Sequence, residues 1–164
     1  MKDATTDKVT MYERLLPSVK EIIERPGDRD KKLQRICDLL RREVPYFDWV
    51  GFYLTDAEKP DDLVLGPYNG APTEHVRISV GTGICGRAAH TRRMFVVQDV
   101  SKETNYLACS PEVKAEIVLP ILVGGDVWGE LDIDSHTLAP FSSEDGEFLG
   151  KICSLVADLA RAGG

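Results

Sequence analysis

Two apolar segments joined by Gly124-Gly125-Asp126 constrain the fold more than any other part of the chain. The first runs from Glu116 to Val123 and the second from Val127 to Asp134. Short segments rich in valine, isoleucine and leucine on either side of a glycine turn predict an antiparallel β-hairpin. We therefore interpret these residues as the last two strands of a sheet.

The remaining periodicity predicts two helices before the sheet and one after it. Apolar residues recur at helical spacing over residues 6–24 and 29–44, and again after Pro140. Pro17 is expected to kink or split the first helix. Further strands are predicted at 49–54, 63–68, 76–80 and 95–97, with a short helix after Gly86 and mostly loop over 99–115.

This order predicts an α+β fold, an antiparallel sheet with N- and C-terminal helices packed on one face. A length of 164 residues suits one domain with its own core. We expect a single domain over 1–164, with N-terminal helices in 1–45, the sheet and a pocket in 46–139, and the C-terminal helix in 140–164.

Charge and hydropathy exclude two classes of partner. The net charge of −7 gives no electrostatic support for binding nucleic acid. No apolar run approaches the roughly 20 residues that a membrane span needs, and the N-terminus lacks the apolar core of a signal peptide. We expect a cytoplasmic protein that binds neither nucleic acid nor a membrane.

Three acids interrupt the apolar hairpin, and the turn decides whether their side chains meet. Asp132 and Asp134 are two residues apart, so they point to the same face of the second strand. If the turn has three residues, Val123 pairs with Val127 and Glu116 lies opposite Asp134. The three carboxylates then share one face, whereas a two-residue turn would place Glu116 on the other face.

Carboxylates held this close repel one another unless a proton or a cation lies among them. The cation could be the ammonium group of an amino-acid ligand or a bound metal ion. The alternative is a solvent-exposed sheet face on which the acids are simply hydrated. Trp49 and Tyr53 lie four residues apart on an earlier predicted strand and therefore share a face. Together with the acids they could wall a small pocket with apolar sides.

The four cysteines do not have the spacing of a metal-binding or redox motif, and we expect them to be thiols at rest. Cys37 and Cys153 lie in helical apolar patterns and are expected to be small core residues. Cys109 lies in a loop, where functional residues are common. Cys85 lies between glycines at a helix start, where the helix dipole can lower the thiol pKa or the residue can simply pack the helix.

Several segments carry a resemblance to a known family, namely GFYL, LVLGPYNG, VRISVGTGICGRAA, QDV, LACS, EIVLPI and GELDIDS. They resemble the GAF-domain enzymes called free methionine-(R)-sulfoxide reductases. The resemblance covers about Trp49 to Phe148 and preserves spacing. Its specific part is the combination of ICG, of AC followed seven residues later by a glutamate, and of LDIDS. It implies a GAF-like fold.

The resemblance also implies a thiol-dependent reduction of free methionine-(R)-sulfoxide to methionine. Cys109 would be the catalytic nucleophile and would become a sulfenic acid. Glu116, Asp132 and Asp134 would act in catalysis, one of them as a proton donor that the crowding of the carboxyls keeps protonated.

Substrate binding would use the same three acids together with the aromatic wall of Trp49 and Tyr53. The charge of the acids would hold the ammonium group, which explains a preference for the free amino acid. We expect no resident metal and no bound cofactor, but an external thiol reductant such as thioredoxin. Members of the family often pair, and apolar positions such as Leu15 and Ile23 could form a homodimer interface.

One departure from the family concerns the reduction cycle. The usual resolving cysteine lies ten residues before the ICG cysteine, and His75 takes that position here. Cys85 could resolve the sulfenic acid instead, or an external thiol could attack it directly. His75 could be a base for Cys109, could join the acids in a site for Mn²⁺, Fe²⁺ or Zn²⁺, or could be a surface residue of its strand.

The competing function belongs to another class. GAF domains often bind small ligands without catalysis, and Cys109 would then be inert or regulatory. A third reading is a redox sensor that forms a disulfide between Cys85 and Cys109. Substitution of Cys109 by serine separates the first two, since it would abolish reduction and leave ligand binding intact.

Overall fold

The computed structural model describes residues 4–104 and 110–163. Its helices are α1 (Ala4–Glu24), α2 (Arg29–Glu43), α3 (Gly83–Thr91) and α4 (Ser143–Arg161), with one 3₁₀ turn, η1 (Val100–Lys102). Its strands are β1 (Trp49–Thr55), β2 (Asp62–Asn69), β3 (Arg77–Ser79), β4 (Phe95–Val97), β5 (Ala115–Val123) and β6 (Asp126–Ser135).

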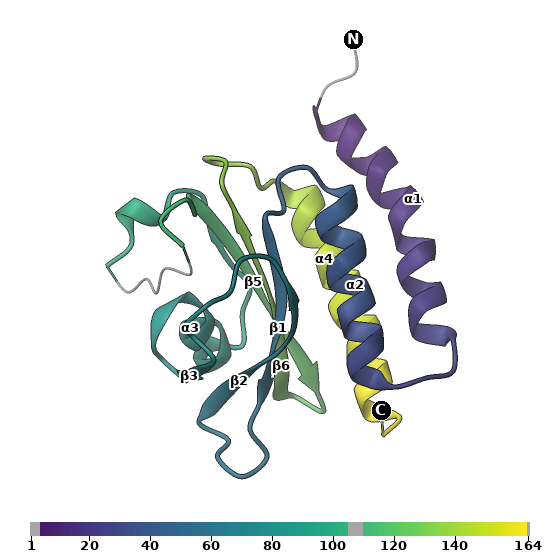
Figure 1. Cartoon of the computed structure of the whole chain (residues 1–164), viewed down its shortest axis with the longest axis vertical. Coiled ribbons are helices and arrows are strands. Elements are labelled where there is room, and N and C mark those ends of the chain that lie inside the picture. Colours follow the sequence, from purple (N-terminus) through teal and green to yellow (C-terminus); the bar gives the residue numbers. More distant parts are fainter. Residues whose placement is uncertain (1–3, 105–109, 164) are drawn as a thin grey trace.

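The strands form one antiparallel sheet in the order β3-β2-β1-β6-β5-β4. Helices α2 and α4 lie along one face of this sheet, α1 packs outside them, and α3 lies on the opposite face (Figure 1). The predicted α+β fold with terminal helices on one face is therefore confirmed. The sheet separates the main core on its α2/α4 face from a second, smaller apolar cluster that α3 forms with the opposite face.

The terminal helices begin where the sequence provides hydrogen-bond acceptors. The Asp28 carboxylate accepts from the backbone N–H of Lys31 at the start of α2, and Ser142 forms a capping box with Asp145 at the start of α4. Pro17 does not divide α1, which continues from Ala4 to Glu24. A single missing N–H is tolerated because α1 is held along its length by packing against α2 and α4.

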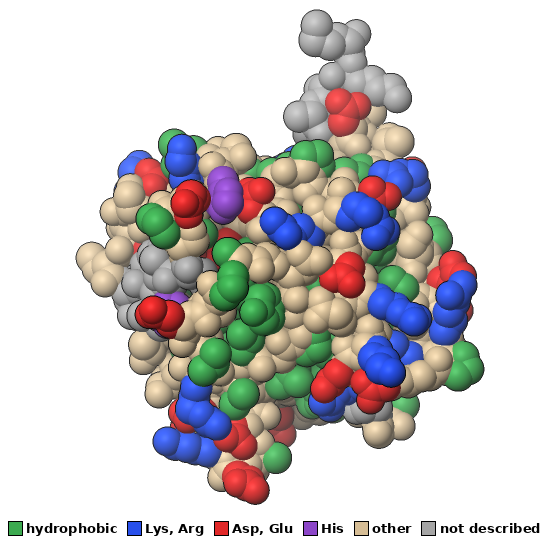
Figure 2. Space-filling model, viewed as in Figure 1, with side chains coloured by type: hydrophobic (Ala, Val, Ile, Leu, Met, Phe, Trp, Pro, Cys, Tyr) green, Lys and Arg blue, Asp and Glu red, His purple; other side chains and the backbone are tan. Residues whose placement is uncertain are grey.

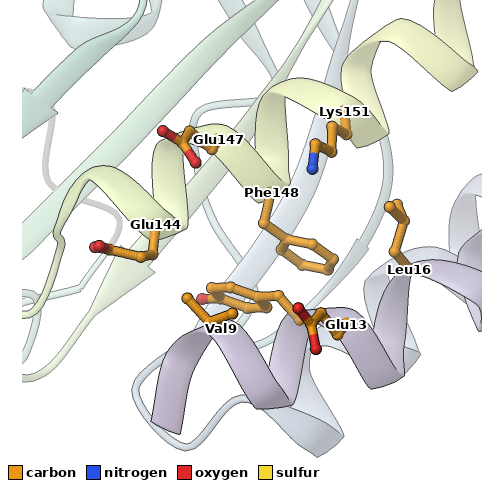
Figure 3. A pocket seen from close by; sticks show the side chains of 8 residues that line it. Val9, Glu13, Leu16, Glu144, Glu147, Phe148 and Lys151 are labelled. Carbon is orange, nitrogen blue, oxygen red and sulfur yellow. The ribbon is translucent and has the colours of Figure 1, made fainter. Parts of the chain in front are cut away.

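The main core fills the space between the sheet and the terminal helices. Figure 3 shows Phe148 of α4 pointing toward α1, where its ring stacks on Tyr12 with the ring centroids 4.0 Å apart. Leu15 is 1% exposed and Ile23 packs partly buried against the same cluster. Leu15 is thus used within the chain and is not available to a dimer interface, whereas the expected role of Ile23 in a homodimer stays a prediction.

The β5–β6 hairpin has the predicted register but a different turn from the three-residue turn that this register suggested. Its turn has two residues, Gly124 and Gly125, because Val123 pairs with Asp126. The pairing then shifts by one residue, since Leu122 faces Val127 while Ile121 faces Gly129. This bulge adds one residue to β6 and restores the register that a three-residue turn would have given. Glu116 therefore lies opposite Asp134, as predicted.

The surface carries mixed charges. Figure 2 shows Lys and Arg side chains interspersed with Asp and Glu on the visible face. Among the described helices, none combines the length and the apolar composition that crossing a membrane requires.

Candidate functional site

The candidate site lies on the face of the sheet that α3 covers. Alternation along the strands sends the side chains of Trp49 and Tyr53 to this face, together with Asp132 and Asp134 of β6. The Cα partners across the strands are Trp49–Asp134, Gly51–Asp132, Tyr53–Glu130 and Glu116–Asp134. The predicted cluster of acids and aromatic rings is therefore assembled by the register.

The acids are buried. Glu116 is 4% exposed, Asp132 1% and Asp134 0%. The alternative in which they are hydrated on an open sheet face is therefore wrong, because α3 and the loops around it cover this face. Burial makes the ionisation of such groups costly.

Sequence reasoning missed a fourth acid, Glu130. It precedes Asp132 by two residues on β6, so it points to the same face, and it is fully buried. Neither of its carboxyl oxygens has a hydrogen-bond partner in the described part of the chain. The period of two along the strand was the available signal for this residue.

Burial raises the pKa of the Glu130 carboxyl well above its usual value, and the charge of Asp132 adds to the effect. Burial also raises the pKa of Asp132, although hydrogen bonds with Glu116 and Cys85 partly oppose the shift. The arrangement therefore favours neutral carboxyls inside the cluster.

Cys85 of α3 points into the same cluster. Its sulfur and one carboxylate oxygen each from Glu116 and Asp132 all lie within 4.8 Å of one another. In the described part of the chain these are the residues grouped closely enough to hold a metal ion. Burial raises the pKa of the thiol well above its usual value, and the nearby carboxylates, Asp132 first, raise it further. The predicted lowering by the helix start is wrong, because a short helix does not offset burial among acids.

The aromatic wall is held by close packing. The Trp49 indole N–H donates to the carbonyl oxygen of Ala71 at 3.0 Å, and its ring stacks on Tyr53 and Tyr68 at centroid distances of 6.4 and 5.4 Å. A Cβ added at Gly51 would lie 2.4 Å from the indole ring. This glycine is therefore needed for the ring to lie flat over β1.

His75 lies at the edge of the site. Its carbonyl oxygen accepts a hydrogen bond of 2.8 Å from the Tyr53 hydroxyl, and the residue is half-buried immediately before β3. It lines a small cavity together with Cys85, Glu116 and Asp132. The interpretation of His75 as a solvated strand residue is therefore wrong. The cavity holds about 10 Å³ for the centre of a water-sized molecule, which is room for roughly one water.

Of the other three cysteines, two have the predicted place in the core and one lies outside the described residues. Cys37 and Cys153 are buried free thiols in the helix-side core, as predicted. Cys109, the predicted nucleophile, lies outside the described residues, as does the rest of 105–109.

Comparison with known proteins gives a family match and several relatives. The GAF domain family model matches residues 28–158. The GAF domain-containing protein A of Dictyostelium discoideum is 37% identical over 149 residues, which cover 91% of this chain and 92% of that protein. The free methionine-R-sulfoxide reductase of Escherichia coli is 38% identical over 123 residues, which cover 75% of this chain and 70% of that protein.

A solved structure matches over nearly the whole chain. The free methionine-R-sulfoxide reductase from Neisseria meningitidis, in complex with its substrate, superimposes with a TM-score of 0.89 at 33% identity, covering 99% of this chain and 93% of that one. The fold, the family match and these relatives agree, and the chain belongs to the GAF domain family.

Proposed function

We propose that this chain reduces free methionine-(R)-sulfoxide to methionine, with the Cys109 thiol as nucleophile. The observation that carries the proposal is the buried carboxyl cluster beside an aromatic wall, in which burial raises the pKa of Asp132. The homologous reductases of Escherichia coli and Neisseria meningitidis support it. A neutral carboxyl next to a ligand is a hydrogen-bond donor and a general acid at neutral pH.

Substrate binding would use two parts of the site. The remaining negative charge among Glu116, Asp132 and Asp134 would hold the ammonium of the free amino acid, which a peptide-bound methionine lacks. Trp49 and Tyr53 would pack against the aliphatic side chain. The cavity among the described residues is close to 10 Å³, so an amino acid enters only if the surrounding loops move.

The chemistry is an oxygen transfer from sulfur to sulfur. The Cys109 thiolate attacks the sulfoxide sulfur while a carboxyl of the cluster protonates the sulfoxide oxygen. The oxygen passes to the Cys109 sulfur while the sulfur–oxygen bond of the substrate and the new sulfur–sulfur bond break. Methionine leaves with its sulfur reduced by two electrons, and Cys109 becomes a sulfenic acid. An external thiol then forms a disulfide with Cys109 and releases water, and a second thiol regenerates the cysteine.

An external dithiol such as thioredoxin is the favoured reductant. Cys85 is 5% exposed and its pKa is raised among four carboxyls, so little thiolate is available there to resolve the sulfenic acid. His75 stands where the family usually has the resolving cysteine, and imidazole cannot form a disulfide.

The test is a stereospecific assay. Purified protein is incubated with separated R and S isomers of free methionine sulfoxide and dithiothreitol, and methionine is quantified. Cys109→Ser is run in parallel, with Cys153→Ser as the matched control, since Cys153 lies in the helix-side core. We expect methionine from the R isomer only, none with Cys109→Ser, and wild-type amounts with Cys153→Ser. An absence of methionine with wild type and excess thiol would refute the enzyme proposal.

A non-catalytic module that binds a small amino-acid ligand is the second candidate. The observation that favours it is the replacement of the resolving cysteine by His75. It predicts saturable binding of a free amino acid or its sulfoxide by calorimetry, unchanged in Cys109→Ser, without release of methionine by either protein.

A further inference from the structure

We propose that Cys85, Glu116 and Asp132 bind one Zn²⁺ ion, which occupies the pocket and inhibits the protein. The proposal that zinc binds here rests on the geometry of these three side chains. The inhibition rests on the proposed reductase function, because it requires that the same acids hold the substrate.

The three donors come from separate elements that meet at one point. Cys85 lies on α3, Glu116 on β5 and Asp132 on β6, and their donor atoms are within 4.8 Å of one another. Zinc–sulfur bonds of about 2.3 Å and zinc–oxygen bonds of about 2.0–2.2 Å place the ligand atoms of a tetrahedral site about 3.3–3.7 Å apart. Small side-chain adjustments are therefore enough to close the site around an ion.

The side chain of Asp132 points to a missing partner. It is 1% exposed and lines the cavity with Cys85 and Glu116, yet its Oδ1 atom has no hydrogen-bond partner among the described residues. No Lys or Arg of the described chain forms an ion pair with Asp132 or with Glu130 beside it. A buried carboxyl oxygen without a donor is a ready ligand for a cation.

The donor set selects the kind of ion. Zn²⁺ displaces the protons of its ligands when it binds. The resulting thiolate with two carboxylates suits Zn²⁺, whereas Mg²⁺ and Ca²⁺ prefer six or more oxygen ligands. Three protein ligands leave the fourth tetrahedral position open for water. The cavity of about 10 Å³, lined by the three donor residues, has room for an occupant about as large as one water molecule.

A bound ion would compete with an amino-acid ligand. The carboxylates that would hold the substrate ammonium would be committed to the metal, and the cavity that the ligand must enlarge would be filled. Zinc would therefore raise the apparent KM for methionine sulfoxide without lowering the maximal rate at saturating substrate.

The binding test uses Co²⁺ as a spectroscopic substitute for Zn²⁺. The full-length protein is titrated with Co²⁺ in a phosphine reductant, because dithiols bind these metals themselves. A thiolate ligand gives a sulfur-to-cobalt charge-transfer band in the near ultraviolet, and Zn²⁺ then displaces the cobalt. The variants are Cys85→Ser, Asp132→Asn, Cys109→Ser and the control Cys153→Ser, each checked for folding by circular dichroism.

We expect one equivalent of Co²⁺ and a charge-transfer band in wild type, Cys109→Ser and Cys153→Ser. Cys85→Ser loses the band, and Asp132→Asn weakens binding by at least about tenfold, which is the scale of losses when even outer ligand contacts are removed. A band that survives in Cys85→Ser and vanishes in Cys109→Ser would overturn the proposal, and so would a wild type without a band.

The activity arm separates this proposal from the reductase function. If methionine is produced, micromolar Zn²⁺ raises the apparent KM in wild type and has at least about tenfold less effect in Cys85→Ser, in keeping with the weakened binding. If no methionine is produced but the cobalt band appears as expected, the metal site stands and the reductase proposal falls. Inhibition of equal strength in both proteins would overturn inhibition through this site.

Discussion

Two buried aspartates on opposite sides of the sheet have opposite surroundings. Asp145, in α4 on the helix side, accepts hydrogen bonds from Lys8 Nζ at 2.7 Å and from the hydroxyls of Tyr12 and Tyr46. Asp132, on the α3 side, has an oxygen without a partner in the described chain and lies among other acids. The first arrangement is complete, and the second leaves room for a ligand.

The pKa values of the two aspartates are shifted in opposite directions. Burial alone would raise the pKa of Asp145, but hydrogen bonds from Lys8, Tyr12 and Tyr46 outweigh it and hold the pKa below its usual value. Burial raises the pKa of Asp132 because its neighbours offer too little compensation. One face of the sheet thus pairs its buried acid with hydrogen-bond donors, and the other leaves buried acids with raised pKa values.

The largest effect is expected at Asp145. Asp145→Ala removes the acceptor that joins α1, α4 and the segment before β1, and it leaves Lys8 largely buried without its partner. We expect the free energy of unfolding to fall by about 3–5 kcal/mol, the usual cost of breaking a buried pair. Urea unfolding measures it, and a loss below 1 kcal/mol would show that the network is not structural.

Gly51 tests the packing of the aromatic wall. Gly51→Ala places a Cβ 2.4 Å from the Trp49 ring and 2.9 Å from Tyr68 Cβ, so the wall must shift. Overpacking of this kind costs about 1–3 kcal/mol. The matched control is Gly150→Ala in α4, where no atom lies within 4 Å of the added Cβ, and alanine should stabilise the helix by about 0.5–1 kcal/mol. Equal effects of both changes in denaturant unfolding would contradict the packing argument.

Substitution of Glu130 should change the stability of the fold in the opposite direction from substitution of Asp145. Glu130→Met replaces a buried carboxyl without partners in the described chain by an apolar side chain of similar length. We expect stability to rise by about 1–2 kcal/mol, because an unsatisfied polar group is removed from the interior. Calorimetry measures the gain, and a clear loss would mean that Glu130 has a partner in the folded protein.

The contributions of the two buried acids to stability should change with pH in opposite directions on the two faces of the sheet. The folded pKa of Glu130 is raised, so between its unfolded pKa and its folded pKa the folded state binds more protons than the unfolded state. Its contribution to stability is therefore present below the unfolded pKa, near 4, and is lost as pH rises above it.

Asp145 behaves in the opposite way. Because its folded pKa is lowered, its contribution is present above the unfolded pKa and is lost as pH falls toward the folded pKa. Unfolding should be followed at pH 2, pH 4 and pH 7 for wild type, Glu130→Gln and Asp145→Asn. Relative to wild type, Glu130→Gln should gain stability from pH 4 to pH 7, and Asp145→Asn should lose it from pH 2 to pH 4. Parallel pH profiles for both variants would refute the contrast.

The sequence predicted the fold because its strands and helices follow strong local patterns. Alternation on β5 and β6 and the helical stripes of α2 and α4 agree with the packing that buries them. The length of the hairpin turn and the presence of the bulge could not be predicted in the same way. A two-residue glycine turn with a bulge and a three-residue turn give the same register at Glu116, and their difference is confined to Ile121 and Leu122.

The site was predicted where it depends on register and missed where it depends on tertiary burial. Glu116, Asp132 and Asp134 meet because their spacing and pairing require it. The raised pKa of Cys85 comes first from burial and then from carboxyls on other elements, and the residues around Cys85 in the sequence reveal neither. Glu130 was overlooked because a single acid beside a glycine resembles the solvated end of a strand.

The placement of the two tryptophans makes the site optically distinguishable from the rest of the molecule. Trp49 stacks on Tyr53 and Tyr68 in the pocket wall, whereas Trp128 lies near the β5–β6 turn, with the guanidinium of Arg29 5.3 Å from the centroid of its ring. Trp128→Phe would leave one indole emitter in the chain. Its fluorescence would then report occupancy of the pocket directly, in real time and without a labelled ligand.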